Sequence, residues 1–323
     1  KGITDDRVPM LRKRLSITGD LQSENLDSAL FDEELEKAVA HFQKRHYLTA
    51  DGAVGKNTFE ALNVSVEARI DQIRVNLERA RWVMHALSSQ YVIVDIAGFH
   101  AFFIQDNATS WVSRVQVGRP YRRTPVFRSD IKYLVFNPTW TVPPGILNKD
   151  ILPALKKNPN YLKERNINVI DHQGNLINQD TIDWSKYPQQ RFPYMLRQEP
   201  GPQNALGQIK FMFPNQHLVY LHDTPSRSLF EREDRTFSSG CIRVEKPFEL
   251  AEILLDNPSQ WNQESIKKLI ESGKPQTVSL PKPLPVLLIY WTADMEEDGS
   301  IYFKKDPYNR DKAVLEGLEG EFK

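Results

Sequence analysis

The sequence has very little cysteine, no excess charge of either sign and no long apolar run. Cys241 is the single cysteine among 323 residues, so the chain cannot form an intrachain disulfide. This usage fits an oxidising compartment, where stray thiols are avoided. Lysine and arginine number 42, as do aspartate and glutamate, so no overall field attracts nucleic acid or a membrane. The longest apolar stretch, residues 286–291, is far too short to span a bilayer.

Metal-binding motifs are missing as well. The sequence has no His-Glu-x-x-His, and one cysteine cannot build a thiolate cage. The pairs His41/His46 and His217/His222 are badly spaced for a shared ion. These absences argue against a metal hydrolase, and we expect neither a metal nor another cofactor.

The N-terminal part of the chain predicts helices. At 323 residues the chain is long enough for two or three domains, and residues 1–63 form the first, with apolar residues at helical spacing. Asp32 is the expected cap of one helix, and Asp51-Gly52 marks a turn. Residues 64–90 predict a connector helix with an apolar stripe. A basic helix that binds nucleic acid is the less favoured reading of that segment.

Near Tyr91 the spacing of the apolar residues changes from the helical repeat to a pattern typical of strands. Residues 91–305 predict a mostly β domain, interrupted by an inserted subdomain at 145–205. The stretch 306–323 is polar and is expected to be a weakly ordered tail. The expected strands are residues 91–96, 101–104, 111–118, 132–140, 210–213, 217–222 and 285–291, with a helix at 248–255.

The lone thiol has a neighbourhood that favours chemistry. Free cysteine is more often buried packing than a reactive group. Cys241, however, follows Ser238-Ser239-Gly240 and precedes Ile242-Arg243, so small residues leave room for a reacting carbonyl and an arginine adds positive potential. His222 lies at the end of an expected strand. A cysteine and a histidine so placed are a candidate nucleophile and base.

Each neighbour of the pair has an expected role. The backbone carbonyl of Asp223 would orient the His222 ring, and an imidazole near a thiol can take its proton and stabilise the resulting ion pair. Backbone N–H groups of Ser239, Gly240 and Cys241 would hold the oxyanion. Gly240 suits this position because glycine adopts strained backbone angles freely.

These motifs resemble the active-site signature of the L,D-transpeptidases, which cross-link bacterial cell walls. The resemblance rests on Tyr220-x-His222, on Ser238 to Arg243, and on Asn137-Pro138-Thr139-Trp140 with Gly118, and it covers about residues 91–147 and 206–303. Two positions depart from the commonest pattern: Ser239 replaces a histidine and Arg243 replaces an asparagine. Whatever that histidine does in other members must be done differently here.

The first 63 residues resemble the small three-helix peptidoglycan-binding domain, against the alternative of a generic helical bundle. The matching residues are Leu11, Leu15, Phe31, Ala38, Val39, Phe42, Gln43, Leu48, Asp51, Gly52, Val54, Gly55, Thr58 and Leu62. With the large insertion, the chain looks most like the long L,D-transpeptidases of Gram-negative bacteria. The resemblance implies a multidomain α+β protein: a mostly β catalytic sandwich with an inserted subdomain, plus the small helical domain.

The family implies a reaction and its partners. Cys241 would attack the diaminopimelate carbonyl of a donor tetrapeptide stem, expel D-Ala, and pass the acyl group to an acceptor stem as a 3→3 cross-link. A carbapenem would be a covalent inhibitor. Expected substrate contacts are Tyr220, Arg243, Trp140 and Asn137, although Trp140 fits the core equally well. The expected location is the periplasm, with an inner-membrane anchor in a segment N-terminal to residue 1.

Two alternatives stay open from the sequence. Water could replace the acceptor, which gives an L,D-carboxypeptidase or endopeptidase. The chain could instead be a non-catalytic wall-binding protein in which Cys241 is vestigial or buried. We also expect the 145–205 insertion to form a cap over the cleft, because transfer needs limited access for water.

Overall fold

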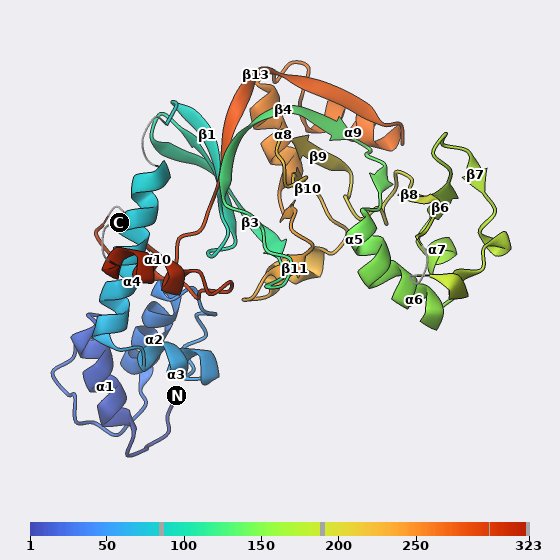
Figure 1. Ribbon diagram of the computed structural model, residues 1–323. Coiled ribbons are helices and arrows are strands. Elements are labelled where there is room, and N and C mark those ends of the chain that lie inside the picture. The colour runs from blue at the N-terminus through green and yellow to red at the C-terminus, as the bar shows by residue number, and fades with distance from the viewer. Residues whose placement is uncertain (84–86, 188–190, 297, 321–323) are drawn as a thin grey trace. The chain divides into compact units, whose positions relative to one another are not determined.

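The computed structural model describes residues 1–83, 87–187, 191–296 and 298–320 (Figure 1). The chain forms two compact units. Unit 1 comprises Lys1–Leu87, Asp95–Gly98 and Tyr290–Lys323, and unit 2 comprises Ser88–Val94 and Phe99–Ile289. The expected β domain ending at residue 305 differs from this division, because residues 290–305 belong with unit 1.

Unit 1 begins with the three expected helices, α1 (Val8–Ile17), α2 (Glu33–Arg45) and α3 (Lys56–Leu62). Asp32 caps α2, as predicted, because its carboxylate accepts a hydrogen bond from the Leu35 N–H at 2.9 Å. Gly52 has a φ of +70°, and a Cβ there would lie 3.0 Å from the Glu36 carbonyl oxygen, so the turn requires glycine. The helices enclose their own apolar core, made of Val8, Leu15, Leu21, Phe31, Leu35, Ala38, Val39, Phe42 and Leu62.

The C-terminal segment completes unit 1. The predicted connector helix is α4 (Val66–Val83), and residues 84–86 lie outside the described part. The prediction of a weakly ordered tail at 306–323 is wrong for 311–319, which form α10 (Asp311–Glu319) beside α4 (Figure 1). The physical reason is a buried polar contact: Arg79 of α4 donates to Asp311 at 2.6 Å. A short hairpin, β14 (Ala293–Met295) and β15 (Ile301–Phe303), precedes it.

Unit 2 is built on a nine-stranded sheet in the order β11-β3-β12-β10-β9-β4-β13-β1-β2. Because β3 also pairs with β2, the sheet closes on itself. The β-rich α+β class expected from the sequence is thereby confirmed. The strands are β1 (Gln90–Asp95), β2 (His100–Gln105), β3 (Ala108–Gly118), β4 (Phe127–Phe136), β9 (Ile209–Met212), β10 (Leu221–His222), β11 (Thr236–Ser238), β12 (Ile242–Val244) and β13 (Gln276–Ile289).

Three strands differ clearly from their predicted bounds. The strand expected at 132–140 is β4, which begins at Phe127 and ends at Phe136. The strand expected at 217–222 is reduced to Leu221–His222. The Asn215 side chain forms hydrogen bonds with the backbone N–H and carbonyl of Val219, which closes a turn, and Leu218 within this turn has a φ of +56°. Conversely, β13 begins at Gln276 rather than 285, with a register shift between Ser279 and Leu284 where prolines interrupt the pairing. Outside the insertion this unit carries the helices α8 (Pro247–Leu255), which lies against β13, and α9 (Gln263–Glu271).

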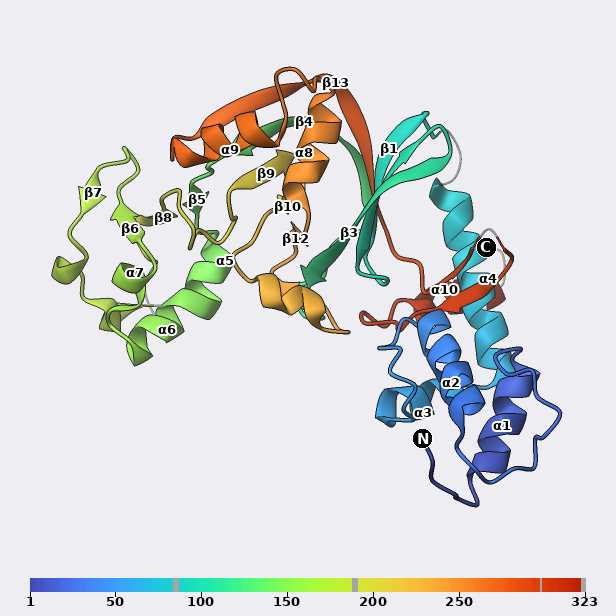
Figure 2. The same cartoon turned by 180° about the vertical axis from the view of Figure 1, so that it is seen from behind.

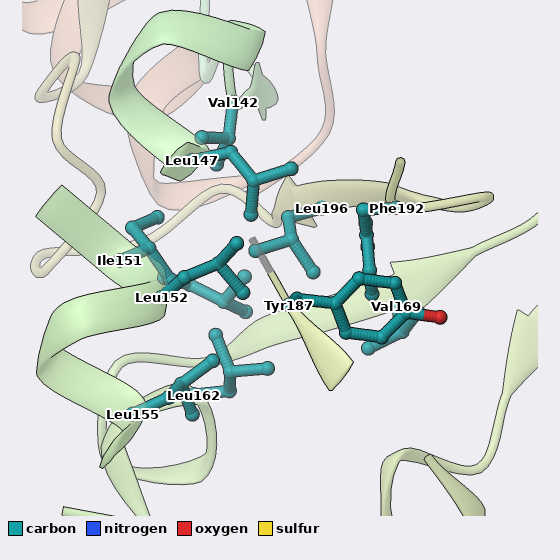
Figure 3. Close-up of a cluster of buried hydrophobic side chains, with 11 residues drawn as sticks. Val142, Leu147, Ile151, Leu152, Leu155, Leu162, Val169, Tyr187, Phe192 and Leu196 are labelled. Carbon is teal, nitrogen blue, oxygen red and sulfur yellow. The ribbon is translucent and has the colours of Figure 1, made fainter. Parts of the chain in front are cut away.

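The insertion folds as a subdomain with its own core. It carries α5 (Pro144–Ile146), a π-helical turn at Leu147–Ile151, α6 (Leu152–Lys157), α7 (Tyr161–Glu164), and the 3₁₀ turns Gln179–Thr181 and Trp184–Lys186. Its sheet has the order β5-β8-β6-β7, formed by β5 (Trp140–Thr141), β6 (Ile167–Ile170), β7 (Leu176–Ile177) and β8 (Met195–Gln198). Figure 3 shows leucine, isoleucine and aromatic side chains from the helices and from the sheet of the insertion meeting in one cluster. The insertion buries apolar side chains in a core of its own. This burial explains why a segment of this length folds instead of forming a structureless loop.

No helix in the described part of the chain combines the length and the apolar character needed to cross a membrane. A cavity of about 510 Å³ lies within unit 1, lined by α3, α4 and residues 303–315. It contains none of the residues singled out for chemistry.

Candidate active site around Cys241

Strand register brings Cys241 and His222 onto one face of the sheet. β10 and β12 are parallel neighbours, with Leu221 opposite Ile242 and His222 opposite Arg243 (Figure 2). Side chains two residues apart on a strand share a face, and so do paired residues on neighbouring strands. Cys241, one residue before Ile242, therefore stands beside Tyr220. The Tyr220 and His222 rings lie 5.7 Å apart on that face.

The same face carries a row of polar side chains that extends across four strands. His222 is paired with Lys210 of β9 on one side and with Arg243 of β12 on the other. Arg243 is in turn paired with Gln116 of β3, whose side-chain oxygen accepts a hydrogen bond from its guanidinium at 3.1 Å. Sequence reasoning missed Lys210 and Gln116, since no local motif marks a residue that register alone brings to the site.

The His222 ring is held in one orientation. Its Nδ1 lies 2.5 Å from the backbone carbonyl oxygen of Asp223, the acceptor that the sequence analysis expected. The Asp223 carboxylate accepts from the Gln208 N–H at 2.9 Å and from Arg227 at 3.1 Å, so the acceptor is itself fixed. With Nδ1 donating, Nε2 is the nitrogen that can take a proton.

Both members of the pair are neutral near pH 7. Burial lowers the pKa of His222 to about 3, and the positive charges of Arg243 and Lys210 lower it further, against the Asp223 and Leu206 carbonyls. Burial raises the pKa of the Cys241 thiol to about 11, against the Tyr220 N–H, the Arg243 charge and the Tyr220 hydroxyl. A resting thiolate–imidazolium pair, which the sequence analysis anticipated, is therefore not the favoured state without substrate.

This electrostatic state predicts the pH dependence of thiol alkylation. Iodoacetamide should modify Cys241 slowly at pH 7, and about tenfold faster for each added pH unit, until the pH nears the raised thiol pKa of about 11. The reason is that only the thiolate reacts, and its fraction grows with pH. Intact mass measured over time at pH 6 to 10 gives the rate, and the single cysteine makes the mass shift unambiguous. A rate that is flat from pH 6 upward would contradict the prediction and indicate a resting ion pair.

The loop before Cys241 is held by its own hydroxyl groups. Ser238 Oγ accepts from the Gly240 N–H at 3.0 Å and donates to the Cys241 carbonyl at 2.5 Å. Gly240 has a φ of +120°, which favours glycine, and its carbonyl accepts from Thr124 Oγ1 at 2.9 Å. The Gly240 N–H was predicted to hold an oxyanion. The structure corrects this, because that N–H is already bonded to Ser238.

Ser239 connects the nucleophile loop to the inserted subdomain. This residue is exposed, and its hydroxyl oxygen accepts from Arg122 Nη1 at 2.9 Å. The same guanidinium nitrogen bonds Asp150, which lies in the π-helical turn of the insertion, at 2.5 Å. Arg122 thus stands beside the position where many family members carry a histidine. It is a third residue that sequence reasoning missed.

Two predicted substrate contacts have other roles in the structure. Asn137 is buried at the end of β4, and its amide donates to the carbonyls of Leu269 and Lys274 at 3.0 and 3.2 Å. This corrects its predicted substrate role, since the amide ties β4 to the end of α9. Trp140 is half-buried and packs against the core of the insertion, the second of the two roles that the sequence allowed. Tyr220 and Arg243 do lie beside Cys241.

No group of three or more His, Cys, Asp and Glu side chains able to hold a metal ion occurs among the residues that the structure describes. The site is therefore an assembly of one thiol, one imidazole, two cations and backbone hydrogen-bonding groups.

Comparisons with known proteins fit this arrangement. Residues 89–270 match the family model of the L,D-transpeptidase catalytic domain, and residues 4–62 match the model described as "Putative peptidoglycan binding domain". A Haemophilus influenzae protein described as "Putative L,D-transpeptidase" is 38% identical over 251 residues, which cover 77% of this chain and 50% of the relative. The chain thus spans about half the length of this curated relative.

Solved structures similar to the chain include two L,D-transpeptidases. An L,D-transpeptidase from Stackebrandtia nassauensis is 15% identical, with 90% of this chain and 97% of that chain covered and a TM-score of 0.31. The ertapenem-acylated catalytic domain of the Enterococcus faecium enzyme is 13% identical, with 63% and 99% covered and a TM-score of 0.29.

Proposed function

The chain belongs to the L,D-transpeptidase family, and from this membership we propose that it is a cysteine-dependent acyltransferase that cross-links peptidoglycan stems. The observation that carries the proposal is the pairing of β10 with β12, which sets Cys241 and His222 on one face while Asp223 orients the imidazole. The substrate proposed is a donor tetrapeptide stem whose third residue is diaminopimelate. The acceptor is the side-chain amine of diaminopimelate on a second stem.

The proposed reaction proceeds in two acyl transfers. As Cys241 Sγ attacks the diaminopimelate carbonyl carbon, its proton passes to Nε2 of His222 and an S–C bond forms. The C–N bond to D-Ala then breaks, and the imidazolium gives its proton to the leaving amine. In the second half, the acceptor amine attacks the thioester, His222 takes a proton from it, and the thiol leaves with that proton. The low pKa of His222 keeps the ring unprotonated at the start of each half.

The oxyanion formed in each half needs hydrogen-bond donors. Because Ser238 occupies the Gly240 N–H, we assign this role to the backbone N–H groups of Ser239 and Cys241. The bond between Arg122 and Ser239 supports this assignment, since it holds the backbone of the loop next to the thiol.

The assay that tests the proposal uses a disaccharide tetrapeptide and intact-protein mass. We expect a dimer linked between two diaminopimelate residues, with release of D-Ala and a transient thioester at Cys241. A carbapenem should also add covalently at this thiol. Tripeptide without dimer would indicate that water is the acceptor, as in an L,D-carboxypeptidase. Absence of any adduct on folded protein would instead support the non-catalytic wall-binding alternative.

The cap role of the insertion is tested in the same assay. The contact of Asp150 with Arg122, and through it with Ser239, supports a role in limiting water near the thioester. Asp150→Asn weakens this contact and should raise the ratio of tripeptide to dimer. An unchanged ratio would contradict the proposal. Asp180→Asn, at an exposed ion pair with Lys163 in the same subdomain, is the matched control.

The proposal also covers the role of the N-terminal helical domain and the cellular location of the protein. The match of residues 4–62 to a peptidoglycan-binding model supports attachment of the enzyme to its polymeric substrate. We propose a periplasmic location with a membrane anchor outside the present sequence. Cell fractionation of the full-length protein tests this, and recovery in the cytoplasmic fraction would contradict it.

A further inference from the structure

Two cations flank His222 without an anionic partner. Lys210 and Arg243 occupy the strand positions on either side of His222, on the face that carries Cys241. Neither side chain forms an ion pair with an aspartate or glutamate in the described part of the chain. Arg114, Arg122 and Arg227 differ in this respect: Arg114 bonds Glu231 and Glu245, Arg122 bonds Asp150, and Arg227 bonds Asp223.

The environment of these two cations is unfavourable as it stands. Both side chains are half-buried, and burial lowers the pKa of each from its ordinary value. Arg243 Nε is fully covered and has no hydrogen-bond partner among the described residues. Buried donors are nearly always bonded, and a buried charge without a partner costs free energy. The charge of the two cations is therefore neutralised only when a negatively charged group binds beside them.

The thiol does not supply that charge. Despite the two cations, the pKa of Cys241 stays above neutrality, so the sulfur is protonated at pH 7. Stabilisation of a resting thiolate thus does not account for the pair. The two cations also lower the pKa of His222, but this effect does not neutralise their own charge.

The proposed substrates bring negative charge to this position. In the donor stem, the D-Ala carboxylate is three bonds from the carbonyl carbon that Sγ attacks. In the acceptor, the attacking amine is attached to a carbon that also carries a carboxylate, so the new amide has a carboxylate at the same three-bond distance. One cationic site next to the thiol can therefore bind the leaving residue first and the acceptor second.

We propose that Lys210 and Arg243 form a carboxylate-binding site next to Cys241, which recognises a free carboxylate of the stem peptides. The inference rests on the function proposed above. Arg243 is suited to the role because its guanidinium offers parallel donors to a carboxylate, while Gln116 fixes one end of it. Lys210 adds a point charge from the opposite side of His222. Such a site would also favour an acceptor that bears a carboxylate over water.

The test compares two donors that differ in one group. Release of the terminal residue is measured for a disaccharide tetrapeptide ending in D-alanine and for the same compound ending in D-alaninamide. The wild-type protein should prefer the free carboxylate by about 10- to 100-fold in kcat/KM. Arg243→Gln and Lys210→Gln should each lower kcat/KM by about tenfold or more for the D-alanine donor, with little change for the amide. Lys132→Gln, at an exposed strand lysine on the opposite face, should change neither.

Further arms separate the possible explanations. A third donor is amidated on the carboxylate of the diaminopimelate side chain. If that carboxylate is the one bound, kcat/KM should fall for this donor and not for the donor that ends in D-alaninamide. Iodoacetamide carries no charge, so its rate with each variant reports thiol reactivity alone. Equal losses with the free-acid donor and with both amidated donors would overturn the proposal, because the cations would then act only on Cys241 and His222.

Binding provides a readout that does not depend on turnover. In a Cys241→Ala background, binding is measured by calorimetry for the free-acid donor and for each of the two amidated donors. The free acid should bind more tightly than the donor whose recognised carboxylate is amidated. This preference should be lost in Arg243→Gln. If the wild-type protein makes no product but the preference remains, the transfer function fails and the carboxylate site stands. Equal binding of the free acid and both amides overturns the site.

Discussion

Cys241→Ala should eliminate the acyl-enzyme and lower product formation by about 10⁴-fold or more, while leaving the fold intact. The loss should be this large because no neighbouring group can replace the sulfur. The Ser238 hydroxyl is occupied by the Gly240 N–H and the Cys241 carbonyl, and the Ser239 hydroxyl is bonded to Arg122. The measurement is the rate of dimer or tripeptide formation from tetrapeptide, with intact mass to detect the thioester.

A second variant tests the base separately from the nucleophile. His222→Gln leaves the thiol in place but removes the proton acceptor, so turnover should fall by about 10²- to 10⁴-fold. Alkylation of Cys241 at high pH should survive, since the thiolate then forms without help. His217→Gln is the matched control, because this exposed histidine lies five residues earlier and outside the row. Turnover by His222→Gln equal to that of His217→Gln would refute the role of His222, and the same result for Cys241→Ala would refute the role of the cysteine.

Lys304→Met should destabilise unit 1 by about 3–5 kcal/mol. Lys304 is only 4% exposed, and its ammonium bonds both Asp95, at the end of β1, and Asp294, in β14. It also lies 4.8 Å from the centre of the Tyr47 ring. Removing the cation leaves the buried Asp95 carboxylate next to the half-buried Asp294 carboxylate, which is the costly way to break a buried ion pair.

The neighbouring lysine is an internal control for this prediction. Lys305→Met removes the same charge and adds the same side chain at an exposed position, so it should change the free energy of unfolding by less than about 0.5 kcal/mol. Denaturant unfolding followed by circular dichroism gives both values. Equal effects of the two substitutions would show that the buried contacts with Asp95 and Asp294 are not stabilising. Asp95→Asn combined with Lys304→Met should recover part of the loss, because one of the two stranded charges is gone.

Local patterns in the sequence predicted much of the scaffold. Helices α1 to α4 and the Asp32 cap follow from apolar spacing and turn residues, which depend on neighbours a few positions away. The strand at 217–222 was predicted too long, because alternation of apolar residues was visible while the Asn215 turn was not. Residues 311–319 look unremarkable in sequence. They are helical because Arg79, more than two hundred residues earlier, binds Asp311.

The candidate nucleophile, its candidate base and the shape of their loop were determined by the sequence itself. Cys241 is the one thiol, Gly240 provides the backbone conformation that precedes it, and His222 ends a strand with Asp223 next to it, so each property is set within a few residues. Only the tertiary structure decided what surrounds them. Lys210 and Gln116 become neighbours of the pair through strand register, and Arg122 reaches Ser239 and Asp150 across 117 and 28 residues. Register and long-range contacts depend on the packing of the whole sheet. No short motif could therefore predict the neutral resting pair, or two cations beside it that lack an acidic partner among the described residues.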